Sequence, residues 1–126
     1  MEQDWRINGQ EAYLQNATLY KIKFPEFWKA AYKEKNAFYQ KVLKCAESYA
    51  ALYPDKSEYL EGEKIQLLWH DHCEFCWEKA MTDIDCEFYC TKDMYHWICK
   101  QCFEDFKEKF GWTEKPPCVL IAGSIP

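Results

Sequence analysis

Cys73-Glu74-Phe75-Cys76 and Cys99-Lys100-Gln101-Cys102 are two C-x-x-C motifs, separated by residues 77–98, in a chain of 126 residues. One such motif is weak evidence, because redox-active sites share it. Two motifs bring four soft sulfur donors together, and Zn²⁺ prefers four such donors in a tetrahedron. The paired motifs therefore predict one structural zinc ion, with the ligands Cys73, Cys76, Cys99 and Cys102.

The residues between and after the two motifs predict a β-hairpin followed by a helix. Residues 87–91 are typical of a strand, residues 92–93 of a tight turn, and residues 94–99 of the return strand. Residues 102–110 place three phenylalanines at spacings of three and four, which puts them on one helix face, and Gly111 suits the C-cap. We expect the second cysteine pair to lie in the first turn of this helix.

A cysteine knuckle, a hairpin and a helix that carries the second ligand pair resemble the treble-clef zinc finger, over roughly a third of the chain. More narrowly, residues 69–76, 95–99 and 103–107 look like a group of short zinc-binding proteins of bacteria and phages whose activity is unknown. Asp4-Trp5-Arg6 and Tyr13-Leu14 look like the same group. The resemblance implies an α+β fold and a metal, and it implies no activity.

The N-terminal half predicts a turn, a strand and one long helix. Asn8-Gly9 suits a turn, and residues 17–24 alternate as a half-buried strand does. Residues 25–53 hold no glycine or proline after Pro25, so we expect one amphipathic helix that begins at Pro25 and ends before Pro54. Its apolar residues form two adjacent stripes at helical spacing, one with Phe27, Ala31, Phe38, Val42, Cys45, Tyr49 and Leu52, the other with Trp28, Tyr32, Tyr39, Leu43, Ala46 and Tyr53.

This pattern predicts three regions along the chain. Residues 1–66 hold the strand and the long helix, with a polar connector at 54–66, and residues 67–112 hold the treble clef. Residues 113–126 form a tail, in which Val119–Ala122 suits an added strand or a docking segment. The long helix at 25–53 could pack within the chain or against a second copy, so a homodimer through this helix stays open.

The composition excludes several classes of protein. The formal net charge is −5 and the isoelectric point is about 5.2, which opposes non-specific attraction to nucleic acid or anionic membranes. No stretch reaches the roughly 18 apolar residues that a membrane span needs. The acidic, polar N-terminus lacks the pattern of a secretory signal, so we expect a cytoplasmic protein. In that reducing compartment its eight cysteines are expected to be thiols rather than disulfides.

The remaining cysteines and histidines have simpler interpretations than a second site. Cys86 and Cys90, with His70, His72 or His96, could build a second metal site, but Cys90 suits a buried hairpin position and Cys86 a loop. We expect His70 and His72 to form hydrogen bonds near the knuckle, where His72 could also replace a cysteine ligand. Cys45 and Cys118 are expected to bind no metal.

These observations favour a non-enzymatic, zinc-stabilised module that binds a protein partner, as an accessory or inhibitor-type protein does. Nucleic-acid binding is the alternative, because residues 21–44 carry seven lysines and two glutamates among many aromatic residues. A nuclease of the HNH type is disfavoured, since its helix would offer only Phe103, Glu104 and Asp105, and His96 alone is suitably placed. No catalytic residue is predicted.

Overall fold

The structure is a computed structural model that describes residues 4–60, 62–83 and 85–116. The chain has a mixed α+β fold and divides into two compact units, each built from segments that are distant in sequence. The described residues of the first unit are 4–22, 71–80 and 87–116, and those of the second are 23–60, 62–70, 81–83 and 85–86. The division of the chain into residues 1–66, 67–112 and 113–126 stays a prediction.

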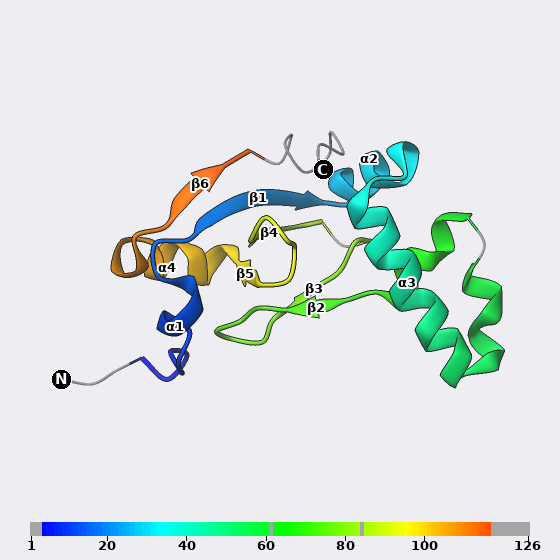
Figure 1. Cartoon of the computed structure of the whole chain (residues 1–126), viewed down its shortest axis with the longest axis horizontal. Coiled ribbons are helices and arrows are strands. Elements are labelled where there is room, and N and C mark those ends of the chain that lie inside the picture. The colour runs from blue at the N-terminus through cyan, green and yellow to red at the C-terminus, as the bar shows by residue number, and fades with distance from the viewer. Residues whose placement is uncertain (1–3, 61, 84, 117–126) are drawn as a thin grey trace. The chain divides into compact units, whose positions relative to one another are not determined.

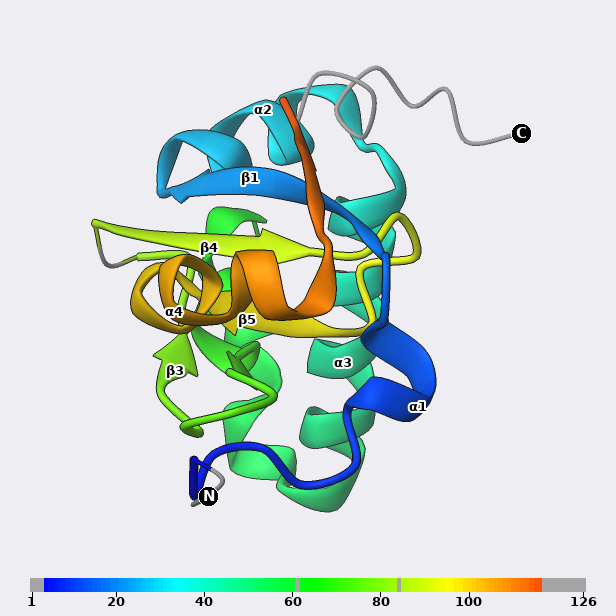
Figure 2. The same ribbon diagram turned by 90° about the vertical axis from the view of Figure 1, so that its left-hand side faces the viewer.

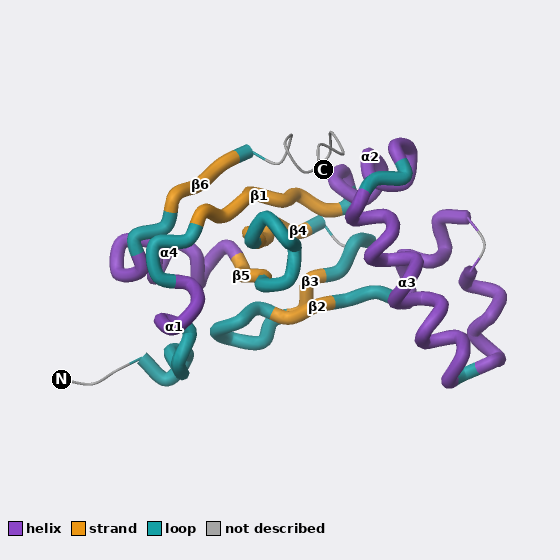
Figure 3. Tube along the Cα trace, viewed as in Figure 1, coloured by secondary structure: helices purple, strands orange, loops and turns teal. Residues whose placement is uncertain are grey.

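Most strands belong to the first unit and most helical residues to the second (Figures 1 and 3). The elements in chain order are α1 (Glu11–Leu14), β1 (Thr18–Phe24), α2 (Glu26–Glu34), α3 (Ala37–Leu52), the 3₁₀ helices η1 (Pro54–Leu60) and η2 (Gly62–Leu68), β2 (Asp71–His72), β3 (Lys79–Ala80), β4 (Cys86–Cys90), β5 (Trp97–Cys99), α4 (Lys100–Phe110) and β6 (Thr113–Lys115). The last two residues of β1 and the first residue of β4 fall in the second unit.

The first unit is built on a sheet with the strand order β5-β4-β1-β6. Figure 2 shows β1, β4 and β5 one below another, and Figure 1 shows β6 beside β1. β1 confirms the predicted strand at 17–24. β6 pairs with β1 in parallel, with Thr18 opposite Thr113, so the beginning of the predicted tail is an added strand. Residues 119–122, for which a strand or a docking segment was predicted, lie outside the described residues.

The hairpin between the cysteine motifs is confirmed, but its turn is longer than predicted. Cys90 pairs with Trp97, so the return strand begins at Trp97 rather than at Met94. Within the connection, the Thr91 carbonyl accepts from the Met94 amide at 2.8 Å, and the Asp93 carboxylate accepts from the Tyr95 amide at 3.0 Å. These local bonds replace ladder bonds, a competition typical of Thr and Asp in turns.

The apolar face of α4 packs as its phenylalanine spacing predicts. The Phe103 ring stacks on Tyr89 of β4 with centroids 3.7 Å apart, and Phe106 lies 4.9 Å from Phe75 of the cysteine knuckle. Phe110 is fully buried, and the left-handed Gly111 (φ 68°) ends the helix as expected. The aromatic residues of this segment therefore connect the sheet, the helix and the knuckle within one core.

The single helix predicted for 25–53 is wrong. Lys35 adopts the left-handed conformation (φ 53°) and ends α2, and Asn36 is the N-cap of α3. The Asn36 side chain accepts hydrogen bonds from the amides of Phe38 and Tyr39 at 3.0 and 3.1 Å. A strong N-cap residue can therefore interrupt a helix without glycine or proline, and Figure 3 shows the short loop between α2 and α3.

The interruption also changes which residues of α3 are buried. The buried positions are Phe38, Val42, Ala46 and Ala50, a spacing of four, whereas Cys45, Tyr49 and Leu52 of the predicted stripe are exposed. In the second unit Phe38 contacts Phe27 (centroids 5.0 Å apart) and Trp69 (5.1 Å), and all three are buried. The aromatic face of this segment thus packs within the chain.

The described residues of the connector predicted at 54–66, namely 54–60 and 62–66, are helical. η1 begins at Pro54, which ends α3 as expected, and η2 follows from Gly62. Within the second unit, Ile65 of η2 is 1% exposed and anchors this segment. In the part of the chain that the structure describes, none of the helices combines the length and the hydropathy that crossing a membrane requires.

The cap at Asn36 gives a stability prediction. Replacing Asn36 with Ala removes the acceptor for two helix amides and should lower the free energy of unfolding by about 1 kcal/mol. Urea unfolding followed by circular dichroism measures this change. The matched variant Asn36→Asp keeps a capping oxygen and should lose less. Equal stability of the alanine variant and the unchanged protein would contradict the role of the cap.

Candidate metal centre

The first cysteine pair lies on a tight loop between β2 and β3. The Cys73 amide donates to the Glu78 carbonyl at 2.8 Å, and the Trp77 amide donates to the Cys73 carbonyl at 3.1 Å. Trp77 takes a left-handed conformation (φ 68°), which turns the chain sharply after Cys76. This folded loop, the knuckle, directs both of its thiols to one side.

The second cysteine pair lies where β5 passes into α4. Cys99 is the last residue of β5 and also the N-cap of α4, and its Sγ accepts from the Cys102 amide at 3.5 Å. The Glu74 amide donates to the Trp97 carbonyl at 2.8 Å, which fixes the knuckle to β5. One strand end, one helix start and one loop therefore meet at four thiols, as the sequence predicted.

The four thiols could hold one metal ion. The Sγ atoms of Cys73, Cys76, Cys99 and Cys102 all lie within 4.8 Å of one another. The Sγ atoms of Cys76 and Cys99 are 3.6 Å apart, close to the ~3.8 Å edge of a tetrahedron with metal–sulfur bonds of about 2.3 Å. Cys73, Cys99 and Cys102 are at most 2% exposed. The donor set and its spacing fit a thiophilic ion, and this cluster is the only such group in the described residues.

Without a metal ion, the thiols of the cluster shift one another's pKa values strongly. Hydrogen bonds from Cys102 and then Cys99 to the Cys73 sulfur hold the pKa of Cys73 far below its usual range. The same contacts raise the pKa of Cys102, first through Cys73, and raise the pKa of Cys99, first through Cys102. The ionisation of one thiol therefore opposes the ionisation of the next. All four can be thiolates only when a cation lies among them.

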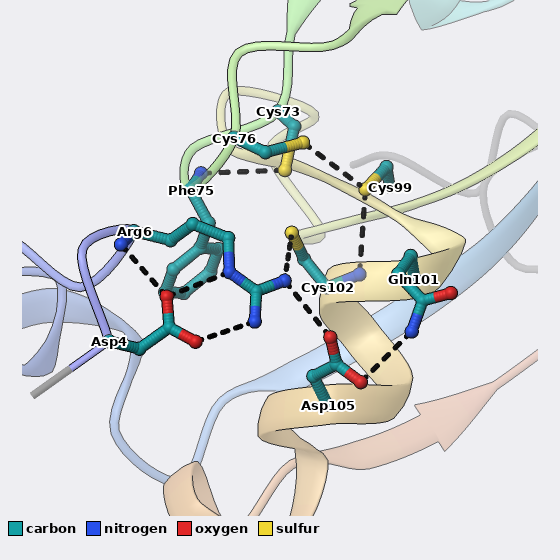
Figure 4. Close-up of polar contacts among 9 residues, drawn as sticks. All are labelled: Asp4, Arg6, Cys73, Phe75, Cys76, Cys99, Gln101, Cys102 and Asp105. Atoms are coloured by element: carbon teal, nitrogen blue, oxygen red, sulfur yellow. Dashed lines mark hydrogen bonds and ion pairs between the residues drawn. The ribbon is translucent and has the colours of Figure 1, made fainter.

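Arg6 lies beside the cysteine cluster and was not recognised as a site residue from the sequence. Its Nη1 lies 3.5 Å from the Cys102 Sγ and 2.9 Å from a carboxylate oxygen of Asp105 (Figure 4). Nε and Nη2 donate to the two oxygens of Asp4 at 2.9 and 2.7 Å. The hydrogen bond from Arg6 holds the pKa of the Asp4 carboxyl at about 2, so Asp4 is ionised at neutral pH.

The knuckle residue Glu74 is held by three side chains of the first unit. One carboxylate oxygen lies 2.8 Å from the His96 Nδ1, and the other accepts from the Tyr13 hydroxyl at 3.2 Å. The Gln10 side chain donates to the Glu74 carbonyl at 2.8 Å and is 3% exposed. His96 therefore positions the knuckle. Its contact with Glu74 spans 22 residues of sequence, so no local sequence pattern indicates this role.

His72 behaves as predicted. Its Nδ1 lies 3.0 Å from the Trp77 carbonyl, so it forms a hydrogen bond beside the knuckle, while the cysteines alone make up the cluster. His70 is exposed, and its predicted bond near the knuckle stays a prediction.

Among the described residues, Cys45, Cys86 and Cys90 do not belong to the four-thiol cluster. Cys90 is buried in β4, as expected for a small apolar residue, whereas Cys86 begins β4 rather than lying in a loop. The Cys86 thiol faces the Met81 carbonyl at 3.8 Å. The described residues hold no second group of three potential ligands. Cys45 is exposed on α3, and Cys118 lies outside the described residues.

Comparison with protein-family models, with curated proteins and with solved structures finds no match to this chain. The interpretation of the site therefore rests on the geometry of these residues.

The position of Cys99, in the thiol cluster and at the N-cap of α4, gives a sharp prediction. Replacing Cys99 with Ser removes one candidate metal ligand but keeps a side chain that can cap α4, because serine is a strong N-cap residue. The variant should therefore lose its bound metal and its cooperative thermal unfolding through the metal site alone. Elemental analysis of protein purified in reductant, together with circular dichroism melting, tests this. Cys45→Ser makes the same change at an exposed position and should behave like the unchanged protein. Equal metal content and melting temperature for Cys99→Ser would rule the site out.

Proposed function

We propose that Cys73, Cys76, Cys99 and Cys102 bind one structural Zn²⁺ in a treble-clef arrangement. The observation that carries this proposal is the meeting of the knuckle with the β5–α4 junction, which gathers four sulfurs within 4.8 Å. The chain order of knuckle, hairpin and helix with the second pair at its N-terminus is the order of a treble clef. Zn²⁺ is the ion that such an all-cysteine tetrahedron fits best.

A zinc ion with four sulfur ligands has no open coordination position for a water or a substrate. Its contribution in this chain would be to fix the knuckle against α4 and so complete the core around Phe75. Binding free energy at such a site is folding free energy. The proposal is therefore of a stabilising metal, with the function residing on the surface of the domain.

We further propose that the zinc-stabilised domain is a protein-interaction module. Large aromatic side chains are exposed in the first unit, with Trp5 at 77%, Trp77 at 70%, Tyr95 at 68% and Tyr13 at 49%. Trp77 directly follows the ligand Cys76, and the His96 ring lies between the rings of Tyr13 and Tyr95, at 4.7 and 4.9 Å. Exposed Trp and Tyr on a rigid support are the residues that most often anchor protein partners.

We infer a cellular setting for this module from its chemistry. Cysteines that form a metal site rather than disulfides suit the reducing cytoplasm, and the resemblance to short zinc-binding proteins of bacteria and phages suits an accessory or inhibitor-type role. Self-association through segment 25–53 is a further possibility for the partner. It would involve the exposed residues Tyr49, Leu52 and Tyr53 of the second unit, since the core-facing residues of α3 are buried.

Nucleic-acid binding through residues 21–44 is the second candidate. Exposed lysines favour it, but Phe24, Phe27, Trp28 and Phe38 are all at most 2% exposed. Bases need accessible rings to stack upon. Lys35 also lies over the Tyr32 ring at 3.4 Å, where its charge is already engaged. We therefore propose a protein rather than a nucleic acid as the partner, and we find no observation that favours the disfavoured HNH-type nuclease.

The interaction proposal predicts a loss of binding when the exposed aromatic residues are removed. Tagged protein is used to capture partners from a host lysate, with quantitative mass spectrometry of what is retained. The double variant Trp77→Ala/Tyr95→Ala should lose a specific partner by 10-fold or more, because truncated aromatic hot spots cost about 2 kcal/mol or more each. The control Tyr53→Ala removes an exposed ring from the other unit. Equal capture by all three proteins would contradict the proposed surface.

Nucleic acid is tested separately. Since phosphate contacts release counterions, binding through the lysines of 21–44 should weaken steeply between low and moderate salt. We expect no shift of single-stranded DNA or RNA in gels at low salt. A shift that Lys29→Glu/Lys33→Glu/Lys41→Glu abolishes would instead make nucleic acid the partner.

A further inference from the structure

The segment formed by residues 4–14 holds the two halves of the cysteine site at once. Arg6 contacts Cys102 and Asp105 in the first turns of α4. Gln10 and Tyr13 contact Glu74 of the knuckle, at 2.8 and 3.2 Å. One short stretch of chain, which lies more than 55 residues before the first cysteine motif, therefore touches both parts that a metal ion would join.

Arg6 is fixed on all sides rather than lying loosely on the surface. Its side chain is 16% exposed, and its guanidinium lies 4.5 Å above the centroid of the Phe106 ring. Its Nε and Nη2 donate to Asp4, and its Nη1 donates to the Cys102 sulfur and to the Asp105 carboxylate (Figure 4). Only the planar, forked guanidinium can satisfy carboxylates and a sulfur in this way, and a lysine ammonium could not.

The residues that follow Arg6 anchor the rest of the segment. The Gln10 side chain also donates to the Arg6 carbonyl at 2.9 Å and accepts from the Asn8 amide. Leu14 is fully buried, and its carbonyl accepts from the indole of Trp112 at 2.8 Å. These bonds bring Arg6 to the cluster in one defined position.

The charge of a metal-bound cluster would strengthen this contact. Four thiolates around Zn²⁺ carry a net charge of −2, and the sulfur of Cys102 accepts a charge-assisted hydrogen bond from Arg6. Hydrogen bonds to ligating sulfurs are the outer contacts that hold a metal in place. Because coupling is reciprocal, a metal that strengthens the contact of Arg6 must itself be retained more firmly by that contact.

We propose that residues 4–14 are a clasp that closes on the metal-bound cysteine cluster through Arg6 and slows the loss of the metal. The proposal rests on the proposed zinc site and assigns regulation of that site to the N-terminal segment. Metal loss opens the clasp, and an open clasp speeds metal loss.

The sequence offers a direct probe of clasp opening, since Arg6 is the sole arginine of the chain. A protease specific for arginine can therefore cut the full-length protein only after Arg6. Cleavage of the zinc-loaded protein should be at least 10-fold slower than cleavage after zinc is removed with EDTA, as measured by the mass of the product that begins at Ile7. Protein unfolded in urea gives the rate for an open site. Equal cleavage with and without zinc would overturn the proposal.

The second measurement is the rate of zinc transfer from loaded protein to a colorimetric chelator. Loss of an outer contact typically lowers metal affinity by roughly 10- to 100-fold. If this loss appears in the dissociation rate, Arg6→Gln and Arg6→Lys should both release zinc faster by a factor of that order. Lys109→Gln removes one positive charge from α4 at an exposed position and serves as the matched control. Asp105→Asn, which loosens Arg6 but keeps its charge, should give an intermediate rate.

These results separate the clasp from the zinc site itself. If purified unchanged protein contains no zinc and melts like Cys99→Ser, the proposed function fails and the clasp with it. If the unchanged protein holds zinc and Arg6→Gln releases it as slowly as Lys109→Gln does, the clasp alone is wrong. Circular dichroism of each loaded variant must match that of the unchanged protein, and a variant that fails this test is replaced in the comparison by Asp105→Asn.

Discussion

Four sulfur atoms within 4.8 Å of one another, three of them on fully buried cysteines, are the constraint on which the first unit depends. Buried thiols this close cannot all ionise, because each thiolate disfavours the next. A cation at their centre would remove that conflict and would join a loop, a strand end and a helix start. Without it, the knuckle is connected to the rest of the unit by a few hydrogen bonds and by the packing of Phe75.

The core around this site is built largely from aromatic rings, which explains much of the unusual composition. Phe75 of the knuckle contacts Phe106 and Phe110 of α4 and Trp112 beyond it, with centroids between 4.9 and 5.8 Å apart. Large rings bury much apolar surface per residue. A small unit whose core is built from such rings can therefore be completed with few residues, and the exposed rings that remain are available for other contacts.

The parts of the fold that follow from local rules could be predicted, and those that depend on distant contacts could not. The ligand pairs, the hairpin, the face of α4 and the cap at Gly111 each have a signal within a few residues. The break at Lys35 and Asn36 contains neither glycine nor proline, so the absence of these residues does not guarantee a continuous helix, because an asparagine cap is sufficient to end one helix and begin the next. The pairing of β6 with β1 and the contact of Arg6 with Cys102 join residues at opposite ends of the chain, and no local pattern reports them.

Arg6 shows which sequence signal could have found such a residue. Fifteen of the sixteen basic residues are lysines, so the single arginine stands out against the composition and indicates a specific role at its position. Lysine and arginine are equally suitable where a positive charge only faces solvent. A side chain that binds two carboxylates and a sulfur at once requires the planar guanidinium of arginine. A single arginine in a lysine-rich chain is therefore a reason to look for a buried anionic partner. In this chain the partners of Arg6 are the carboxylates of Asp4 and Asp105 and the sulfur of Cys102, which belongs to the one cluster of thiols in the described residues that could hold a metal ion.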